Sequence, residues 1–371
     1  MQLSRNLTRH RTYVLVCPIL AFFLLNASSQ ETNPTQGESA SYHKRAAVGI
    51  EQLQSWYDPA TGLYRTTGWW NAANAITTLA DYSRVTGDKA YDSVFSNVFS
   101  AAQKTSPGFL NNFYDDEGWW ALAWIGVYDL THQERYLQMA ASIFEDMAKG
   151  WDETCSGGIW WSKDRKYKNA IANELFLSVA AHLATRSKDR KLGAHYLEWA
   201  QRELKWFSNT GMINASHQIN DGLDAACANN HKTTWSYNQG VILGGLSELY
   251  RRTHDRALLS LADTIAEATL SSPVLTDAQG ILHDPCEPDC GGDGTQFKGI
   301  FVRNLAQLYK ADPSLRLKTF VLANADNIWN GMHPPQYSIG TIWNAPYGTV
   351  NASTQSSGDD VLVSVVSMGA H

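Results

Sequence analysis

Two adjacent carboxylates followed by tryptophans make residues 111–124 (NNFYDDEGWWALAW) the segment of this sequence best suited to catalysis. Asp115 and Asp116 fall where a loop is expected to pass into a helix, and the exposed N–H groups at a helix start stabilise anions. Helix capping would account for one such Asp. Capping does not require two of them, followed by a third acid and by Trp119 and Trp120, whose rings would exclude water and shape a site.

Paired carboxylates indicate a particular chemistry. Two neighbouring carboxyls repel each other when both are ionised, so the pKa of one is expected to rise while the helix dipole keeps the other low. Such a split provides one acid and one nucleophile. Adjacent side chains can bring their carboxyls within about 5–6 Å, which is typical of a retaining glycosidase, because an inverting enzyme needs a wider gap for water. The residues themselves do not say which Asp takes which role.

Aromatic and polar side chains in other loops and at other helix starts are candidates for sugar binding. Trp160 and Trp161 could form a stacking platform, although alternation would let one of them pack the loop on the core. Asp221 could hydrogen-bond sugar hydroxyls or equally form an Asx turn. Tyr237 and Asn238 begin a helix and could face a groove. Capping and hydrogen bonding between helices are the competing interpretation, somewhat favoured for Asn238.

A repeated helical pattern must position these residues. Polar turns recur at Val85–Asp88, Leu130–Gln133, Ala184–Ser187, Arg252–Asp255 and Lys310–Pro313. The segments before these turns are apolar nearly all round, as in buried helices, and cover residues 72–82, 119–130, 171–184, 241–250 and 300–309. The segments after the turns, such as 189–207, have an apolar stripe and a charged face, so they are expected on the outside.

Helices near 46–56 and 359–368 bring the expected total to about twelve, and strand-like alternation is scarce. The simplest all-α architecture is an (α/α)6 barrel, in which six helical hairpins close into a toroid. An irregular helical bundle or an open solenoid is the alternative. In a toroid the loops that join outer to inner helices meet at one end, and we expect the site there. These loops cover residues 106–114, 152–168, 209–235 and 272–295.

Composition restricts the classes of function. Of the 371 residues, 44% are hydrophobic and only 18% are charged, which excludes a disordered chain. The net charge of -6 disfavours binding to nucleic acid, because it would repel phosphate. The 14 Trp residues require either a large core or a long binding surface. A low charge suits a neutral polysaccharide, which is bound by flat faces and hydrogen bonds.

The N-terminal segment indicates targeting rather than fold. Basic residues precede an apolar run over 13–25 and small residues at 27–29, which is the pattern of a secretory signal. We therefore expect a signal peptide over 1–29, a flexible leader over 30–44 and a single catalytic domain over 45–371. The short apolar C-terminal end does not fit a lipid-anchor signal. A secreted, extracellular protein with no membrane attachment after signal cleavage is predicted.

Four cysteines remain after the signal, and a secretory route favours disulfides. Of the three possible pairings, Cys286–Cys290 with Cys155–Cys227 is favoured. A zinc site that combines the first two with His283 is the alternative. The acidic loop around them lacks the ligand order of an EF-hand, so neither a metal nor a cofactor is predicted. N-glycosylation is predicted at two sequons, Asn214 and Asn351.

Residues 114–125 (YDDEGWWALAWI) resemble the signature of glycoside hydrolase family 76, the endo-α-1,6-mannanases. Further stretches resemble this family in order along most of the chain: GGIWW at 157–161, KNAIANELF at 168–176, NDGL at 220–223 and TWSYNQG at 234–240. The resemblance implies the (α/α)6 fold and retaining hydrolysis of α-1,6-mannosidic bonds in mannan backbones. It also implies that Asp115 is the nucleophile and Asp116 the general acid/base. A monomer acting on α-1,6-mannan is expected.

Three other functions compete with hydrolysis. A transglycosidase would use the same site to attach glycans to a cell wall. A non-catalytic glycan-binding protein would need the aromatic residues but not two adjacent acids. A helical-barrel terpene cyclase would use Asp-Asp-x-x-Asp to bind magnesium, but Trp119 occupies the fifth position and a secretory signal does not suit such an enzyme.

Overall fold

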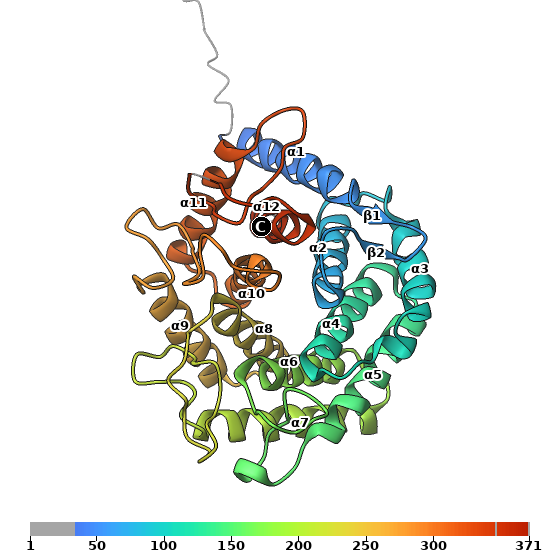
Figure 1. Cartoon of the computed structure of the whole chain (residues 1–371), viewed down its shortest axis with the longest axis vertical. Coiled ribbons are helices and arrows are strands. Elements are labelled where there is room, and N and C mark those ends of the chain that lie inside the picture. Colours follow the sequence, from blue (N-terminus) through green and yellow to red (C-terminus); the bar gives the residue numbers. More distant parts are fainter. Residues whose placement is uncertain (1–33, 346, 370–371) are drawn as a thin grey trace, which may run out of the picture.

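The computed structural model describes residues 34–345 and 347–369, and twelve α-helices form most of this part. Six of them line the centre of the molecule (Figure 1): α2 (Trp69–Thr86), α4 (Tyr114–Thr131), α6 (Ala170–Arg186), α8 (Ser236–Thr253), α10 (Phe297–Ala311) and α12 (Ala352–Met368). Six others surround them: α1 (Pro34–Gln54), α3 (Asp92–Ala101), α5 (Glu134–Met147), α7 (Arg190–Asn209), α9 (Arg256–Leu270) and α11 (Leu315–Gly331).

The inner helices form a closed ring. Each packs on the next along the chain, and α12 packs on both α10 and α2, which closes the circle (Figure 1). Each of α4, α6 and α8 also packs on the outer helix that follows it. The (α/α)6 barrel predicted from the sequence is therefore confirmed, and an open solenoid is excluded for the described part of the chain.

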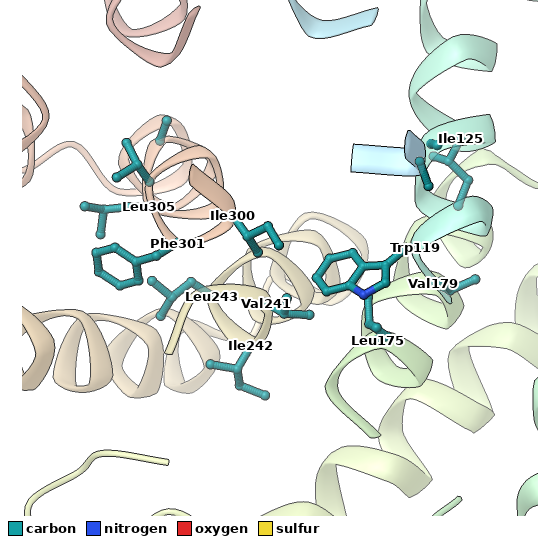
Figure 2. Packing of buried hydrophobic residues seen from close by; sticks show 14 of the residues in the cluster. Trp119, Ile125, Leu175, Val179, Val241, Ile242, Leu243, Ile300, Phe301 and Leu305 are labelled. Atoms are coloured by element: carbon teal, nitrogen blue, oxygen red, sulfur yellow. The ribbon is translucent and has the colours of Figure 1, made fainter. Parts of the chain in front are cut away.

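The hydrophobic pattern explains which helices lie inside. In α6 every residue from Ala170 to Ala184 is buried, as expected for a helix that is apolar nearly all round. In α7 burial is confined to one stripe that includes Tyr196, Ala200 and Phe207, and its charged face is left to solvent. Apolar side chains from α4, α6, α8 and α10 meet around Trp119 towards the middle of the ring (Figure 2).

The two ends of the barrel differ in their connections. Inner helices pass to outer ones through short turns, and left-handed residues end three of them: Gly87 after α2, His132 after α4 and His254 after α8. Outer helices return to inner ones through much longer segments, such as 148–169 and 210–235, and the first return carries the two-residue strands β1 (Tyr57–Asp58) and β2 (Leu63–Tyr64). Because the hairpins alternate in direction, all long returns lie at the end where the inner helices begin.

The predicted leader differs from the structure. Helix α1 begins at Pro34, so residues 34–44 belong to a helix rather than to a flexible segment. The predicted signal peptide over 1–29 lies outside the described residues. No helix in the described part is both long and apolar enough to cross a membrane.

Both favoured disulfides are present. Cys155 and Cys227 join the return segments that precede α6 and α8, and Cys286 and Cys290 close a small loop before α10. The zinc alternative is wrong, because its two thiols are consumed in a disulfide.

Removing the long-range disulfide is expected to cost the most stability. The Cys155→Ser/Cys227→Ser variant should lose about 4 kcal/mol of unfolding free energy, because a separation of 72 residues restricts the unfolded chain strongly. The Cys286→Ser/Cys290→Ser variant, with a separation of 4, should lose about 2 kcal/mol. Urea unfolding of the two variants provides the comparison. Equal losses would contradict this account.

Candidate active site

The two aspartates lie in the first turn of α4, at the end of the barrel where the long segments meet. The N-cap of α4 is Phe113, and no side chain caps this helix. Asp115 and Asp116 are therefore not capping residues in the strict sense, although they lie where the helix dipole favours negative charge. Both side chains are partly exposed, which leaves them accessible to a ligand.

Each carboxylate of the pair is held by a donor from outside the helix. The indole Nε1–H of Trp161 donates to Asp115 Oδ2 over 2.8 Å, and the backbone N–H of Asp116 donates to Asp115 Oδ1 over 3.0 Å. Asp116 Oδ2 accepts a hydrogen bond of 2.5 Å from the side-chain amide of Asn111. The two acids are thus fixed by separate loop residues and do not share one donor.

Both carboxyls have raised pKa values. Burial raises the pKa of Asp115 to about 8, and repulsion from Asp116 adds to this rise, while the hydrogen bond from Trp161 opposes it. Burial also raises the pKa of Asp116 to about 6, against the hydrogen bond from Asn111, and Asp293 adds to the rise. The expectation that one of the two pKa values stays low is wrong, because burial raises the pKa of both carboxyls. Interacting carboxyls titrate as a pair, so near neutral pH the pair holds one proton.

Glu117, the third acid of the motif, has a structural role. Its side chain is fully buried, and Lys163 donates to Oε1 over 2.8 Å while also pairing with Asp146 at 2.7 Å. Burial raises the pKa of Glu117 to about 7, and Lys163 opposes the rise. Because Lys163 comes two residues after Trp161, this ion pair fixes the loop that carries the donor to Asp115.

The same loop is anchored again by a buried lysine. The ammonium of Lys168 donates to Asp152 Oδ1 at 2.8 Å and to the backbone oxygens of Thr154, Gly157 and Gly158 at 2.7–2.9 Å. The backbone oxygen of Asp152 is a fifth acceptor at 3.3 Å, and these oxygens hold the segment around the ammonium as they would around a bound cation. The position of Trp161 therefore rests on a rigid support.

The two loop tryptophans take different positions, as alternation allows. Trp161 is 38% exposed and lies beside Asp115, so its ring is accessible. Trp160 donates to Asp152 over 2.7 Å and has the Lys168 ammonium 4.8 Å from its ring centroid. Trp160 thus belongs to the cluster that anchors the loop.

The helix tryptophans are less accessible than the sequence suggests. Trp120 is fully buried between Trp69 and Phe109, with ring centroids 4.8 and 4.7 Å away, so its prediction as a sugar-binding residue is wrong. Trp119 is only 2% exposed and points into the ring (Figure 2). Its ring stacks on that of Trp70, with the ring centroids 5.6 Å apart, so neither face of Trp119 is accessible to a ligand.

Three further predicted residues come from the segment before α8 and from the first turn of α8. Asp221 is partly exposed and accepts a hydrogen bond of 2.5 Å from the Tyr167 hydroxyl. Tyr237 stacks face to face on Phe297 at 3.8 Å; burial raises its pKa well above the usual value, and the charges of Asp221 and Asp115 add to the rise. Tyr237 is therefore near both the pair and Asp221. Asn238 is fully buried, so its prediction as a groove residue is wrong.

Sequence reasoning missed four residues at this site. Trp70 donates to Asp293 over 2.8 Å, which brings the disulfide loop before α10 to the same end of the barrel. Asn111 binds Asp116, and Phe297 stacks on Tyr237. The repeated Gly-Trp-Trp at 68–70 and 118–120 was an available signal for Trp70. Asn111 begins the 111–124 segment that also holds the aspartates, whereas nothing local marked Asp293 or Phe297 as site residues.

Metal ligands are not assembled here. Within residues 34–345 and 347–369, no group of three or more His, Cys, Asp or Glu side chains is arranged to hold a metal ion. The arrangement offers a proton donor, an anionic oxygen and exposed aromatic faces, which are the requirements of glycoside chemistry.

The sequence profile of glycosyl hydrolase family 76 matches residues 41–363. The chain belongs to this family. It is 29% identical to the mannan endo-1,6-alpha-mannosidase DCW1 of Eremothecium gossypii over 67% of its length, but that match spans 59% of the relative. It is 26% identical to the mannan endo-1,6-alpha-mannosidase DFG5 of Candida albicans, and this match covers 84% of the present chain and 75% of the relative.

Solved structures of this family have the same fold. An inactive variant of the α-1,6-mannanase GH76A of Salegentibacter sp. HEL1_6, in complex with α-1,6-mannotriose, superposes with a TM-score of 0.79. The two sequences are 26% identical, and the match covers 88% of this chain and 99% of that one. The barrel of Dfg5 from Chaetomium thermophilum, 22% identical, superposes with a TM-score of 0.77 over 89% of this chain and 90% of that one.

Neutralising Asp115 should stabilise the protein at high pH. A carboxyl whose pKa is higher in the folded than in the unfolded state binds a proton on folding, so its contribution to the unfolding free energy falls as pH rises between the two values. For Asp115 this interval runs from about 4 to about 8. Asp115→Asn should therefore gain about 2 kcal/mol at pH 8, since partial exposure screens the full effect, and gain little at pH 4.

Asp146→Asn is the matched control for this measurement. The pKa of Asp146 is lowered: burial alone would raise it, but bonds from Lys149 and Lys163 outweigh that effect. This substitution should lower stability at pH 8. Urea unfolding of both variants at pH 4 and pH 8 tests the pair, and a loss of stability in Asp115→Asn at pH 8 would refute the account.

Proposed function

We propose that this protein hydrolyses α-1,6-mannosidic bonds within mannan backbones and retains the anomeric configuration. The adjacent pair Asp115 and Asp116, in the first turn of α4 of a family 76 chain, carries this proposal. The Salegentibacter mannanase that binds mannotriose is an inactive variant in which two consecutive aspartates are replaced by asparagine. The names of the fungal relatives specify the same linkage and endo action.

The proposed reaction has two steps. The ionised carboxylate of Asp115 attacks the anomeric carbon and forms a glycosyl ester, while Asp116 gives its proton to the departing glycosidic oxygen. A water molecule then attacks the same carbon, loses a proton to Asp116 and releases Asp115. Positive charge develops at the anomeric carbon in both steps, next to Asp115, so this charge favours placing the shared proton on Asp116. The indole N–H of Trp161 supports the ionised form of Asp115.

The surroundings of the pair suit a neutral sugar chain. The exposed ring of Trp161 offers a stacking face, and Tyr237 and Asp221 offer polar groups to sugar hydroxyls. Trp70, which rests on Trp119, extends the aromatic surface towards α2. We propose these residues as sugar-binding positions, in place of the buried Trp120 and Asn238.

We also propose that the protein is secreted. Its two disulfides fit folding in an oxidising compartment, and the predicted signal supplies a route there.

Substitution of each aspartate should separate the two roles. Asp115→Asn should abolish cleavage of linear α-1,6-mannan because no nucleophile remains. Asp116→Asn should lower kcat about 10²–10⁴-fold on mannan, since the leaving oxygen is not protonated. On an aryl α-mannoside whose leaving group needs no proton, Asp116→Asn should keep the rate of the first step, measured as a burst, whereas Asp115→Asn should remain inactive.

Product analysis completes this test. NMR of the fresh product should show the α anomer, and the inverted product would refute the retaining mechanism. Longer oligosaccharides formed with an added acceptor would favour a transglycosidase. Mannan binding without turnover, unaffected by both substitutions, would favour a non-catalytic binding protein and overturn the proposal.

The pH dependence of kcat/KM should be bell-shaped. Activity requires one proton on the pair, so it should fall below about pH 6, where both carboxyls are protonated, and above about pH 8, where both are ionised. Glu117 also titrates in this range, with a pKa of about 7. In the Glu117→Gln variant Lys163 still has its ion pair with Asp146. This variant should therefore retain both the acidic and the alkaline limb of the pH profile. A flat profile between pH 5 and 9 would contradict the shared-proton account.

A further inference from the structure

The end of the barrel where the inner helices finish is hollowed. A cavity of about 560 Å³ is lined by side chains from all six inner helices, and its residues in α4 run from Leu122 to Asp129. Asp116 precedes Asp129 by thirteen positions on the same helix, which corresponds to about 20 Å along the axis. The cavity is therefore separate from the aspartate pair. Its size falls within the range of small-molecule sites.

Most charged side chains that line this cavity form ion pairs with one another. Arg84 pairs with Asp81 at 2.6 Å, and Arg303 pairs with Asp360 at 3.0 Å. Arg186 donates two hydrogen bonds, of 2.6 and 2.7 Å, to the carboxylate of Asp129. Glu248 is held by Arg186 and Arg251, each at 2.6 Å. Each carboxylate that lines the cavity thus has a cationic partner.

One cationic side chain that lines the cavity, Lys310, has no acidic partner among the described residues. Its ammonium has neither a hydrogen bond nor an ion pair in this part of the chain. Lys310 is an exposed residue although it lines the cavity. Desolvation and the positive charge of Arg84 lower its pKa, and the charge of Asp81 opposes this shift. Gln307 and Ser364 line the same cavity, and their side chains likewise make no hydrogen bond within the described part of the chain.

Compensation of helix dipoles explains only part of this arrangement. Arg84, Arg186, Arg251 and Lys310 lie in the last turns of α2, α6, α8 and α10, where cations offset the partial negative charge of the helix ends. Arg84, Arg251 and Lys310 are exposed, so this role explains their presence at the helix ends. It does not account for a cavity in which all acids are paired, one ammonium is not, and neutral donors are unused beside it.

We propose that this cavity is a second ligand site that binds a small polyhydroxylated anion, a sugar carrying a phosphate or carboxylate group. The anionic group would lie at Lys310 and Arg84, and the hydroxyls would reach Gln307 and Ser364. An anion there supplies the missing partner of Lys310, and charge-assisted bonds of this kind are the strong ones. The site does not depend on the hydrolysis proposed above.

The cavity wall nevertheless reaches the aromatic residues of the aspartate site. Arg303 lines the cavity, hydrogen-bonds Asn74 as well as Asp360, and holds its guanidinium 5.9 Å from the Trp119 ring centroid. Arg303 therefore lies between the cavity and Trp119. The ligand of the cavity should therefore bind without competing with mannotriose.

Calorimetric titration of the full-length protein tests the proposal, with mannose 6-phosphate, glucuronate, mannose and inorganic phosphate as probes. The two sugar anions should bind, and mannose should not. Lys310→Gln should weaken their binding at least tenfold, and Lys310→Glu should abolish it. Lys318→Gln on α11, outside the cavity, is the matched control and should leave the affinity unchanged.

The outcomes separate this site from the aspartate pair. The inactive Asp115→Asn/Asp116→Asn variant should bind the sugar anions as well as the unaltered protein does, so failure of the proposed hydrolysis would leave this result standing. Binding of mannose as tight as that of mannose 6-phosphate, an unchanged affinity in both Lys310 variants, or no binding of any probe would overturn the proposal. Inorganic phosphate binding as tightly as mannose 6-phosphate would overturn its polyol part.

Discussion

The shared direction of the six inner helices is the constraint on which the rest of this molecule depends. It gathers six helix N-termini at one end of the ring and six C-termini at the other. The N-terminal end stabilises negative charge, and there the chain places its adjacent carboxylates, Asp115 and Asp116. The C-terminal end requires positive charge, and there it places a set of cations that includes Arg186 and Lys310. The barrel is thus electrostatically polar along its axis, and the two ends differ in chemistry for the same reason.

A site built on long segments needs fixed supports, and this one has them from three directions. Lys168 is wrapped by loop oxygens, Lys163 ties the loop to α4 through Glu117, and a disulfide joins two return segments. With the loop fixed, Trp161 can present one N–H to Asp115 in a defined geometry. This rigidity offsets the free-energy cost of keeping two desolvated carboxyls side by side. Preorganisation of this kind matters because a donor that is already oriented needs no rearrangement during the reaction.

Local patterns predicted more of the fold than of the site. The inner helices, the aspartate pair and the Cys286–Cys290 disulfide belong to short stretches of sequence, whereas the Cys155–Cys227 pairing was favoured among three alternatives. Trp120 and Asn238 were misplaced because neighbouring helix residues point about 100° apart, and only the packing of other helices decides which direction is open. Trp70 and Asp293, 223 positions apart, meet only because the ring closes, so no local signal could join them. Desolvation by distant segments also raised both carboxyl pKa values, where the isolated helix start predicts one high and one low.

The raised pKa values bear on how the pair can work. In the free protein burial raises the pKa of both carboxyls, yet a nucleophile must be ionised when it attacks. The two requirements are compatible because the carboxyls share one proton, and moving it between them leaves the charge of the pair unchanged. A sugar ring in the site changes the balance, since positive charge grows at its anomeric carbon beside Asp115 and the departing oxygen needs the proton that Asp116 then holds. The proton is therefore best regarded as belonging to the pair, and the substrate, rather than the protein alone, assigns the roles.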